Sequence, residues 1–282
     1  MVERSTENGY ALITGGSQGI GKQIALELAS RGYNILIVAL HHPNIAEAKA
    51  DILSKYDIKV DTISVDLTEI SSAQEVFDWC NKEGYKVQIL VNNAGFGYAG
   101  AFESYNHEFY DNLMKINMVA PVNLCRLFLD DLKSFSRGYI LNIGSAAAYS
   151  DMPFKTVYAA TKKFLYGFTL ALREELRDTG VSLTIICPSG VATNASVMQN
   201  VKDMGAVARL STTTPEHIAH KAVKGMFARK TVIVPLAITK LYVGMVRLLP
   251  RGIMLRMIGN KFRKSKVKLY KTPQQQNADD AA

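Results

Sequence analysis

The sequence predicts an α/β protein built on one doubly wound parallel sheet, and two observations support this fold class. Short β-rich runs alternate with helical patterns through the first 190 residues, and a glycine-rich segment joins the first run to the first helical pattern. Such alternation is typical of a parallel sheet covered by helices on both faces. The 282 residues, 48% of them hydrophobic, suffice for one large domain of this kind, so a second domain is not required.

Apolar runs mark the predicted strands. The first begins at Tyr10 and ends at the glycines, and the others are Asn34 to Ala39, Val60 to Val65, Val87 to Val91, Tyr139 to Ile143 and Ser182 to Cys187. A helix is predicted to follow the glycines directly. A later helix is predicted over residues 155–177 from the spacing of its apolar residues and from the glycine that closes it, namely Val157, Phe164, Leu165, Phe168, Leu172 and Gly180.

Three glycines shape the segment from Tyr10 to Gly21, which reads YALITGGSQGIG. Gly15 permits a tight turn, Gly19 lets the backbone approach a pyrophosphate, and Gly21 allows the helix to pack on the strand. The N-terminus of the following helix favours an anion. The spacing differs from the commoner Gly-x-Gly-x-x-Gly fingerprint, but its place at the first strand-to-helix junction predicts a dinucleotide-binding turn.

Tyr158 and Lys162 are the candidate proton-transfer pair. They stand four residues apart in the predicted helix, and residues at this spacing share one helix face. An unperturbed tyrosine has a pKa of about 10, and an adjacent ammonium group lowers that value by favouring the phenolate. Lys162 would therefore tune Tyr158 as a general acid or base. Ser145, thirteen residues before Tyr158, could donate a hydrogen bond to a substrate oxygen and hold it beside the phenol.

With these motifs in this order, the chain resembles the short-chain dehydrogenase/reductase (SDR) family from about Tyr10 to Thr193, roughly two thirds of its length. The resemblance implies a Rossmann fold and a hydride transfer between a nicotinamide ring and a carbonyl or carbinol carbon. The motifs that carry it are Thr14-Gly15-x-x-x-Gly19-x-Gly21, Asp66-Leu67, Asn92-Asn93-Ala94-Gly95, Asn117, Ser145, Tyr158-x-x-x-Lys162 and Pro188-Ser189-Gly190-Val191-Ala192-Thr193.

The resemblance also implies roles for the matched residues. The catalytic tetrad would be Asn117, Ser145, Tyr158 and Lys162, with Asn117 holding a water that links Lys162 to solvent. Asp66 would contact the adenine, Asn93 to Gly95 the adenine-side ribose, and Val191 with Thr193 the carboxamide. The full set of implied cofactor-binding residues is Thr14, Gly15, Ser17, Gln18, Gly19, Ile20, Gly21, Asp66, Leu67, Asn93, Ala94, Gly95, Tyr158, Lys162, Val191 and Thr193. The family usually has Pro-Gly where this chain has Pro188-Ser189, so that loop departs from the pattern.

The end of the second predicted strand favours NADP(H) over NAD(H). NAD enzymes place an acidic side chain there to bond the ribose 2′-hydroxyl, whereas this strand ends in Val38-Ala39-Leu40-His41-His42. Without an acid, there is room for a 2′-phosphate. Many NADP-dependent relatives carry an arginine where this chain has Leu40, so the phosphate partner would have to come from His41, His42, Lys22 or Ser17.

Basic residues are concentrated in the C-terminal part of the chain. Fourteen of the 33 lysines and arginines lie between His217 and Ala278, a stretch without aspartate or glutamate. We expect an NADP(H)-binding domain over residues 1–230, with a substrate loop at 188–214. A basic, apolar and helical C-terminal extension is expected over 231–270, followed by a disordered tail at 271–282.

The C-terminal extension has two open interpretations. A membrane-spanning helix is excluded, because lysine and arginine residues interrupt every apolar run. The extension either lies on an anionic membrane surface, as helices broken at Pro250, or packs as a cap over the substrate cleft. Nucleic acid is not expected as a partner, because aromatic residues are sparse there and no motif accompanies the charge.

The substrate is expected to be hydrophobic. The extension is similar to one in a subgroup of membrane-associated short-chain reductases that act on lipid-like ketones, including 3-ketoacyl, 3-ketosphinganine and hydroxysteroid enzymes. Residues 195–210 of the substrate loop are largely apolar or small, which suits such a substrate. We therefore predict an enzyme that interconverts a ketone and a secondary alcohol with NADP(H). The alternatives are an NADP(H)-sensing scaffold or regulator, which the intact tetrad disfavours, and an extended-family epimerase or dehydratase, which the glycine spacing disfavours.

Further expectations concern the environment of the protein. Cys80, Cys125 and Cys187 are widely spaced and form no metal-binding pattern, which predicts reduced, mostly buried thiols and no metal. The N-terminal residues contain no apolar run typical of a secretion signal, which favours a cytoplasmic protein, peripheral at the inner face of a membrane if the extension binds lipid. By resemblance we expect a homodimer or homotetramer, packed through helices that include residues 104–132 and 155–177.

Overall fold

The computed structural model describes residues 9–40, 42–191 and 212–264. A single sheet of seven parallel strands has the order β3-β2-β1-β4-β5-β6-β9. The strands are β1 (Tyr10–Thr14), β2 (Asn34–Ala39), β3 (Val60–Ser64), β4 (Val87–Asn92), β5 (Gly138–Ile143), β6 (Val181–Ile186) and β9 (Val232–Ile233). The predicted doubly wound parallel sheet is confirmed. Its strand order reverses between β1 and β4, and in open α/β sheets ligands bind at such a switch point.

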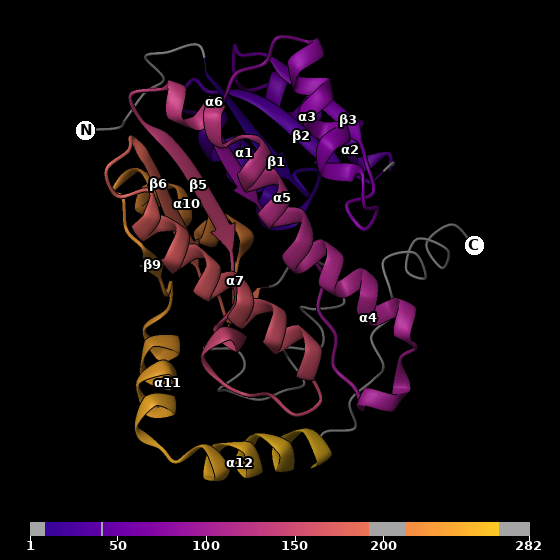
Figure 1. Ribbon diagram of the computed structural model, residues 1–282, viewed down its shortest axis with the longest axis vertical. Coiled ribbons are helices and arrows are strands. Elements are labelled where there is room, and N and C mark those ends of the chain that lie inside the picture. Colours follow the sequence, from indigo (N-terminus) through magenta and orange to yellow (C-terminus); the bar gives the residue numbers. More distant parts are fainter. Residues whose placement is uncertain (1–8, 41, 192–211, 265–282) are drawn as a thin grey trace.

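Helices cover both faces of the sheet, and Figure 1 shows α5 and α7 running along one of them. That face carries α3 (Ser72–Lys82), α5 (Ala120–Leu127), α6 (Leu129–Ser134) and α7 (Thr156–Glu175), whereas α1 (Gly19–Ala29), α2 (Asn44–Leu53) and α10 (Pro215–Phe227) cover the other. Side chains alternate across each strand, so that Leu12 packs on the first face and Ile13 on the second.

Shorter elements follow the carboxyl ends of the strands. Between β4 and α5 lie η1 (Phe102–Ser104), α4 (His107–Met114) and a π-helical turn, η2 (Lys115–Val119), which leads directly into α5. After β5 comes the 3-10 turn η3 (Ala146–Tyr149). A separate pair of short parallel strands joins β7 (Gly190–Val191) to β8 (Thr212–Thr213).

The C-terminal extension forms two helices, α11 (Ala237–Leu248) and α12 (Arg251–Lys264), and the predicted break at Pro250 is confirmed. Figure 1 shows α11 at the lower left, below β9, and α12 along the bottom of the molecule, both away from β2 and β3. The hydroxyls of Tyr242 and Ser150 lie 2.6 Å apart, and the rings of Phe262 and Phe154 stack at 6.1 Å between centroids. Across the described residues, every helix is too short or too polar to cross a membrane.

Candidate active site

Lys162 is a buried basic side chain at the carboxyl end of β5. Its Nζ donates a hydrogen bond to the carbonyl oxygen of Ile143, the last residue of β5, over 3.1 Å, and lies 5.9 Å from the centre of the Tyr158 ring. Burial disfavours the charged ammonium and lowers the pKa of Lys162 to about 8. The predicted pairing of Tyr158 and Lys162 on one face of α7 is therefore present.

Asn117 reaches this site from the π-helical turn η2. Its Nδ2 donates to the carbonyl oxygen of Phe96 over 3.0 Å and to Oγ1 of Thr161 over 3.2 Å. Its Oδ1 is buried and has no hydrogen-bond partner among the described residues. A buried, unpaired carbonyl oxygen of this kind is usually satisfied by an ordered water.

Ser145 occupies the N-cap of η3, two residues beyond the end of β5. Its Oγ accepts a hydrogen bond from the backbone N–H of Ala147 over 3.1 Å. Because this bond uses the oxygen as the acceptor, the hydroxyl hydrogen can still be donated to a substrate. The side chain is 9% exposed, so it is nearly but not fully enclosed.

Tyr158 lies in the first turn of α7, against the segment that follows β4. A Cβ added at Gly97 would come within 3.0 Å of the Tyr158 ring, and one added at Gly95 would come within 2.3 Å of Asn117 Oδ1 and 3.8 Å of Lys162 Nζ. The Gly95 to Gly97 segment is thus in contact with three members of the predicted tetrad. Only glycine allows the backbone this close to them.

The glycine turn between β1 and α1 has the predicted geometry. Gly15 and Gly19 have φ values of +64° and +55°, which favour glycine, and a Cβ added at Gly21 would lie 2.2 Å from the carbonyl oxygen of Gly15. Asn93 Nδ2 donates to the carbonyl oxygens of Thr14 and Gly15 over 2.9 and 3.0 Å. The Asn93 side chain therefore holds the turn, and its predicted ribose contact stays a prediction.

Other predicted cofactor residues surround this turn. Thr14 Oγ1 accepts from the N–H groups of Asn93 and Ala94, both over 3.0 Å, and so joins β1 to β4. Asp66 Oδ1 accepts from the N–H and the hydroxyl of Thr68. Thr14, Leu67 and Ala94 line one narrow recess. Ser17 lies in the turn, Gln18 is the N-cap of α1, and Ile20 packs on the core.

These residues fit a dinucleotide, because Gly15 and Gly19 adopt positive φ in a turn that leads into the N-terminus of α1, where backbone N–H groups favour a phosphate. Two of the predicted partners of a 2′-phosphate, Lys22 and His42, bond other residues of the chain. Lys22 Nζ pairs with Asp51 at 2.9 Å, and His42 Nδ1 accepts from the N–H of Asn44 over 3.2 Å. Val191 lies in β7, packed against the core. His41, Thr193, loop residues 195–210 and the tail lie outside the described residues.

Several site residues escaped the sequence analysis. Thr161 Oγ1 links Asn117 to the carbonyl oxygen of Tyr158, and the Tyr98 hydroxyl accepts from the Val157 N–H at the start of α7. Thr161 and Asn117 are 44 residues apart, and Tyr98 and Val157 are 59 residues apart, so no local sequence pattern marks these two contacts. Burial raises the pKa of Cys187 to about 11, and all three cysteines are free and buried, as predicted.

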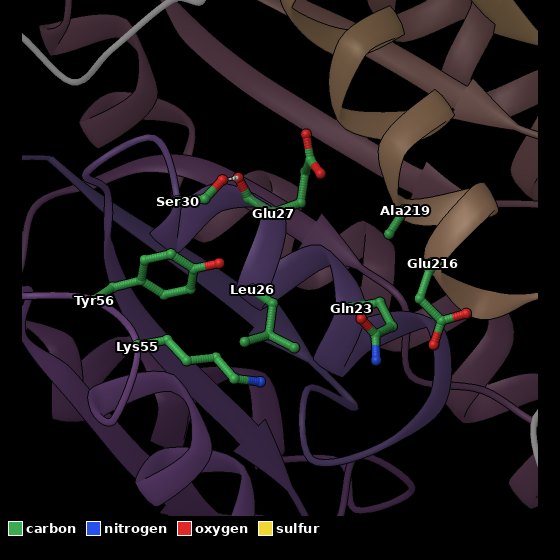
Figure 2. Close-up of a pocket in the computed structure, with 8 residues that line it drawn as sticks. All are labelled: Gln23, Leu26, Glu27, Ser30, Lys55, Tyr56, Glu216 and Ala219. Atoms are coloured by element: carbon green, nitrogen blue, oxygen red, sulfur yellow. Dashed lines mark hydrogen bonds between the residues drawn. The ribbon is translucent and has the colours of Figure 1, made fainter.

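A surface pocket of about 280 Å³ lies elsewhere, between α1, α10 and the residues after α2. Figure 2 shows its lining side chains, Gln23, Leu26, Glu27, Ser30, Lys55, Tyr56, Glu216 and Ala219. None of these belongs to the predicted site. Among the described residues, no group of histidine, cysteine, aspartate or glutamate side chains could hold a metal ion.

A doubly wound sheet with a glycine turn at its switch point is typical of dinucleotide-binding proteins, and in this chain an Asn–Ser–Tyr–Lys group lies at the adjoining strand ends. The chain belongs to the short-chain dehydrogenase family, since the family model described as short chain dehydrogenase matches residues 9–204.

Similar proteins agree with this assignment. The chain is 34% identical over 192 residues to the very-long-chain 3-oxoacyl-CoA reductase of Rattus norvegicus, an alignment that covers 65% of this chain and 60% of the relative. It thus matches about 60% of that relative's length. Among solved structures, it resembles the bulky-bulky ketone specific alcohol dehydrogenase from Comamonas testosteroni (27% identity, TM-score 0.72, 88% and 94% covered) and a metagenomic short-chain oxidoreductase in complex with NADP (25%, 0.67, 81% and 96%).

Proposed function

We propose that the protein is an NADP(H)-dependent oxidoreductase that interconverts a hydrophobic ketone and a secondary alcohol, reducing a 3-oxoacyl-type substrate with NADPH. The observation that carries the proposal is the buried Lys162 ammonium beside the Tyr158 ring. Gly95 packs closely against both this ammonium and Asn117. In the described part of the chain no carboxylate pairs with Lys162, and an ammonium group held beside a tyrosine ring stabilises a phenolate.

The residues of the chain divide the chemistry between them. A nicotinamide held by the glycine turn and the residues around it would supply the hydride to the carbonyl carbon. Ser145 donates a hydrogen bond to the carbonyl oxygen, and Tyr158 transfers its phenolic proton to that oxygen as the carbinol forms. Protonated Lys162 stabilises the phenolate left on Tyr158. Asn117 Oδ1 would hold a water through which Lys162 exchanges a proton with solvent, and its lack of a protein partner supports this role.

Four observations support the finer parts of the proposal. The sequence has no acidic side chain at the end of β2 to bond a ribose 2′-hydroxyl, and the similar metagenomic oxidoreductase is in complex with NADP. The name of the rat relative points to a 3-oxoacyl thioester, and that of the Comamonas enzyme to bulky ketones. The cytoplasmic location and the homodimer or homotetramer remain predictions.

Replacing Tyr158 by phenylalanine tests the proposal. NADPH oxidation would be followed with a long-chain 3-oxoacyl thioester, 3-ketosphinganine, a steroid ketone and a small polar ketone, with NADH in parallel. We expect Tyr158→Phe to bind NADPH but to lose about 10²- to 10⁴-fold in kcat, the usual contribution of a general acid. Tyr56→Phe, in the remote pocket of Figure 2, is the matched control and should keep full activity.

Two results would contradict the proposal. Retained turnover in Tyr158→Phe would remove Tyr158 from the reaction. A wild-type protein that binds NADPH tightly but turns over none of these ketones would favour the sensing scaffold instead.

A further inference from the structure

The two helices of the C-terminal extension have an inner and an outer side. On the inner side, Thr239 and Val243 of α11 and Met254 of α12 are at most 8% exposed. Phe262 stacks on Phe154, which lies just before α7. The inner side therefore already supplies the apolar stripe with which an amphipathic helix packs on its own protein.

The outer side carries an unusual set of exposed side chains, here called the extension patch. Its apolar members are large, with Leu248 86% exposed, Leu241 66% and Met257 58%. A helix that already buries one stripe usually exposes polar residues on the other. In α11, Leu241, Met245 and Leu248 stand at i, i+4 and i+7, so they share one exposed face, and exposed apolar faces mark interaction surfaces. The patch comprises Leu241, Met245, Leu248, Leu249, Ile253, Leu255 and Met257 with the exposed basic residues Lys240, Arg251, Arg256, Lys261 and Arg263.

The charge of the patch selects its partner. Neither α11 nor α12 contains an aspartate or glutamate, and the sequence has none from His217 to Ala278. Two copies of the chain that met through this surface would bring like charges together. An anionic lipid leaflet instead attracts the basic side chains to its headgroups and accepts the apolar ones at the acyl boundary.

We propose that the extension patch docks α11 and α12 side-on against an anionic lipid surface. The helices that carry the patch lie close to the start of α7. Tyr242 of α11 bonds Ser150, and the ammonium of Lys155, three residues before Tyr158, lies 6.0 Å from the centre of the Phe262 ring in α12. Resting on the proposed function, this arrangement places the ketone-reducing site beside the lipid phase in which a hydrophobic substrate is dissolved.

Co-sedimentation with vesicles tests the docking directly. The full-length wild-type protein would be mixed, without cofactor or ketone, with phosphatidylcholine vesicles that contain or lack phosphatidylglycerol. We expect binding to the anionic vesicles, weakened about tenfold by each of Leu248→Gln and Met257→Gln. Arg256→Gln and Lys261→Gln should each weaken it about fivefold and reduce its sensitivity to salt.

Matched controls lie elsewhere on the surface. Ile70, between β3 and α3, is 86% exposed, as Leu248 is, and Lys82 is an exposed lysine at the end of α3. Ile70→Gln and Lys82→Gln should leave vesicle binding unchanged. Because the patch residues are exposed and glutamine is a good helix former, the patch variants should unfold at the wild-type temperature.

Several outcomes would overturn the proposal. The proposal fails if the wild type does not bind anionic vesicles, or if the Leu248→Gln/Met257→Gln variant binds them as well as the wild type does. It also fails if the wild type self-associates and this variant does not. Reduction of a water-soluble ketone, assayed separately without vesicles, reports on the proposed function alone. A protein that binds vesicles but reduces no ketone would therefore sink the function and leave the docking intact.

Discussion

At the residue scale, Lys162 shows how the fold alters the chemistry of one side chain. The lysine is enclosed beneath the Gly95 segment and bonded to the Ile143 carbonyl oxygen, and its pKa is lowered from 10.5 to about 8. The unfolded chain therefore holds this proton more tightly than the folded protein between about pH 8 and 10.5. Below about pH 8, Lys162 is protonated in both states, and its buried charge lowers the free energy of unfolding. As the pH rises from about 8 to 10.5, the folded protein has lost this proton and the free energy of unfolding increases.

Lys162→Met should remove this pH dependence. The free energy of unfolding of the wild type gains a contribution of about 2–4 kcal/mol as pH rises through the window, and the variant should lack it. Urea unfolding at a series of pH values measures the difference. Lys163→Met is the control, because Lys163 is at the surface and pairs with Asp151. Parallel stability profiles for Lys162→Met and the wild type would contradict the buried-ammonium account.

Gly21 is required by close packing, not by its dihedral angles. A Cβ there would lie 2.2 Å from the Gly15 carbonyl oxygen, whereas a Cβ at Gly167 in α7 would meet nothing within 4 Å. Both glycines are helical, so alanine gains helix propensity at either position. We expect Gly21→Ala to destabilise the protein by about 1–3 kcal/mol and to weaken NADPH binding, because the turn must shift.

Gly167→Ala provides the comparison for Gly21→Ala. It should stabilise the protein by about 0.5–1 kcal/mol and leave NADPH binding unchanged. Urea denaturation and fluorescence titration with NADPH measure the two effects. If Gly21→Ala bound NADPH as tightly as Gly167→Ala does, the glycine turn would not be the phosphate site.

At the element scale, one aromatic ring joins α12 to the residues at the start of α7. Phe262 stacks on Phe154, and the Lys155 ammonium lies over the same ring at 6.0 Å. Phe154 has a φ of +65°, a left-handed conformation that is strained for a phenylalanine. Its carbonyl oxygen accepts from the Gly100 N–H over 2.8 Å, a contact that helps to hold this conformation.

Phe262→Ala should release α12 while leaving the sheet intact. Losing the ring stacking and the cation–π contact should lower the free energy of local opening by about 1–2 kcal/mol, so that amide exchange in α12 accelerates about 5- to 30-fold. Hydrogen exchange resolved by peptide measures this. Met257→Ala, which alters a 58% exposed side chain of the same helix, is the control. Equal exchange in both variants would show that Phe262 does not hold α12.

At the scale of the whole molecule, the cofactor site joins segments from both halves of the sheet, so an occupied site should stabilise the entire domain. A ligand at about 100 times its dissociation constant adds about 2.7 kcal/mol of stability. For a domain of this size that corresponds to roughly 5–10 °C in Tm.

We expect NADPH to raise the unfolding temperature by about this amount, and NADH at the same concentration to raise it less, because β2 ends without an acid. Differential scanning fluorimetry with both nucleotides measures the shifts, and Gly21→Ala should reduce them. An equal or larger shift with NADH would contradict the assigned preference.

Local patterns in the sequence were sufficient for much of this architecture. The run Asn34 to Ala39 became a strand with the predicted bounds, and the other predicted runs became strands whose ends differ by at most one residue, because strands buried on both faces are continuously apolar. The turn at Gly15 and the shared face of Tyr158 and Lys162 followed from local rules about glycine and helix spacing. These features depend on neighbours a few residues apart, which the sequence shows directly.

The tertiary structure alone decided which distant groups meet. It placed Thr161 against Asn117, used the Asn93 side chain to hold the glycine turn, paired Lys22 with Asp51 and set Phe262 on Phe154. It also separated the inner side of α11 and α12 from the exposed patch, which the interleaved apolar and basic residues left ambiguous. Such contacts join segments tens of residues apart, and packing, not local periodicity, determines which of them form.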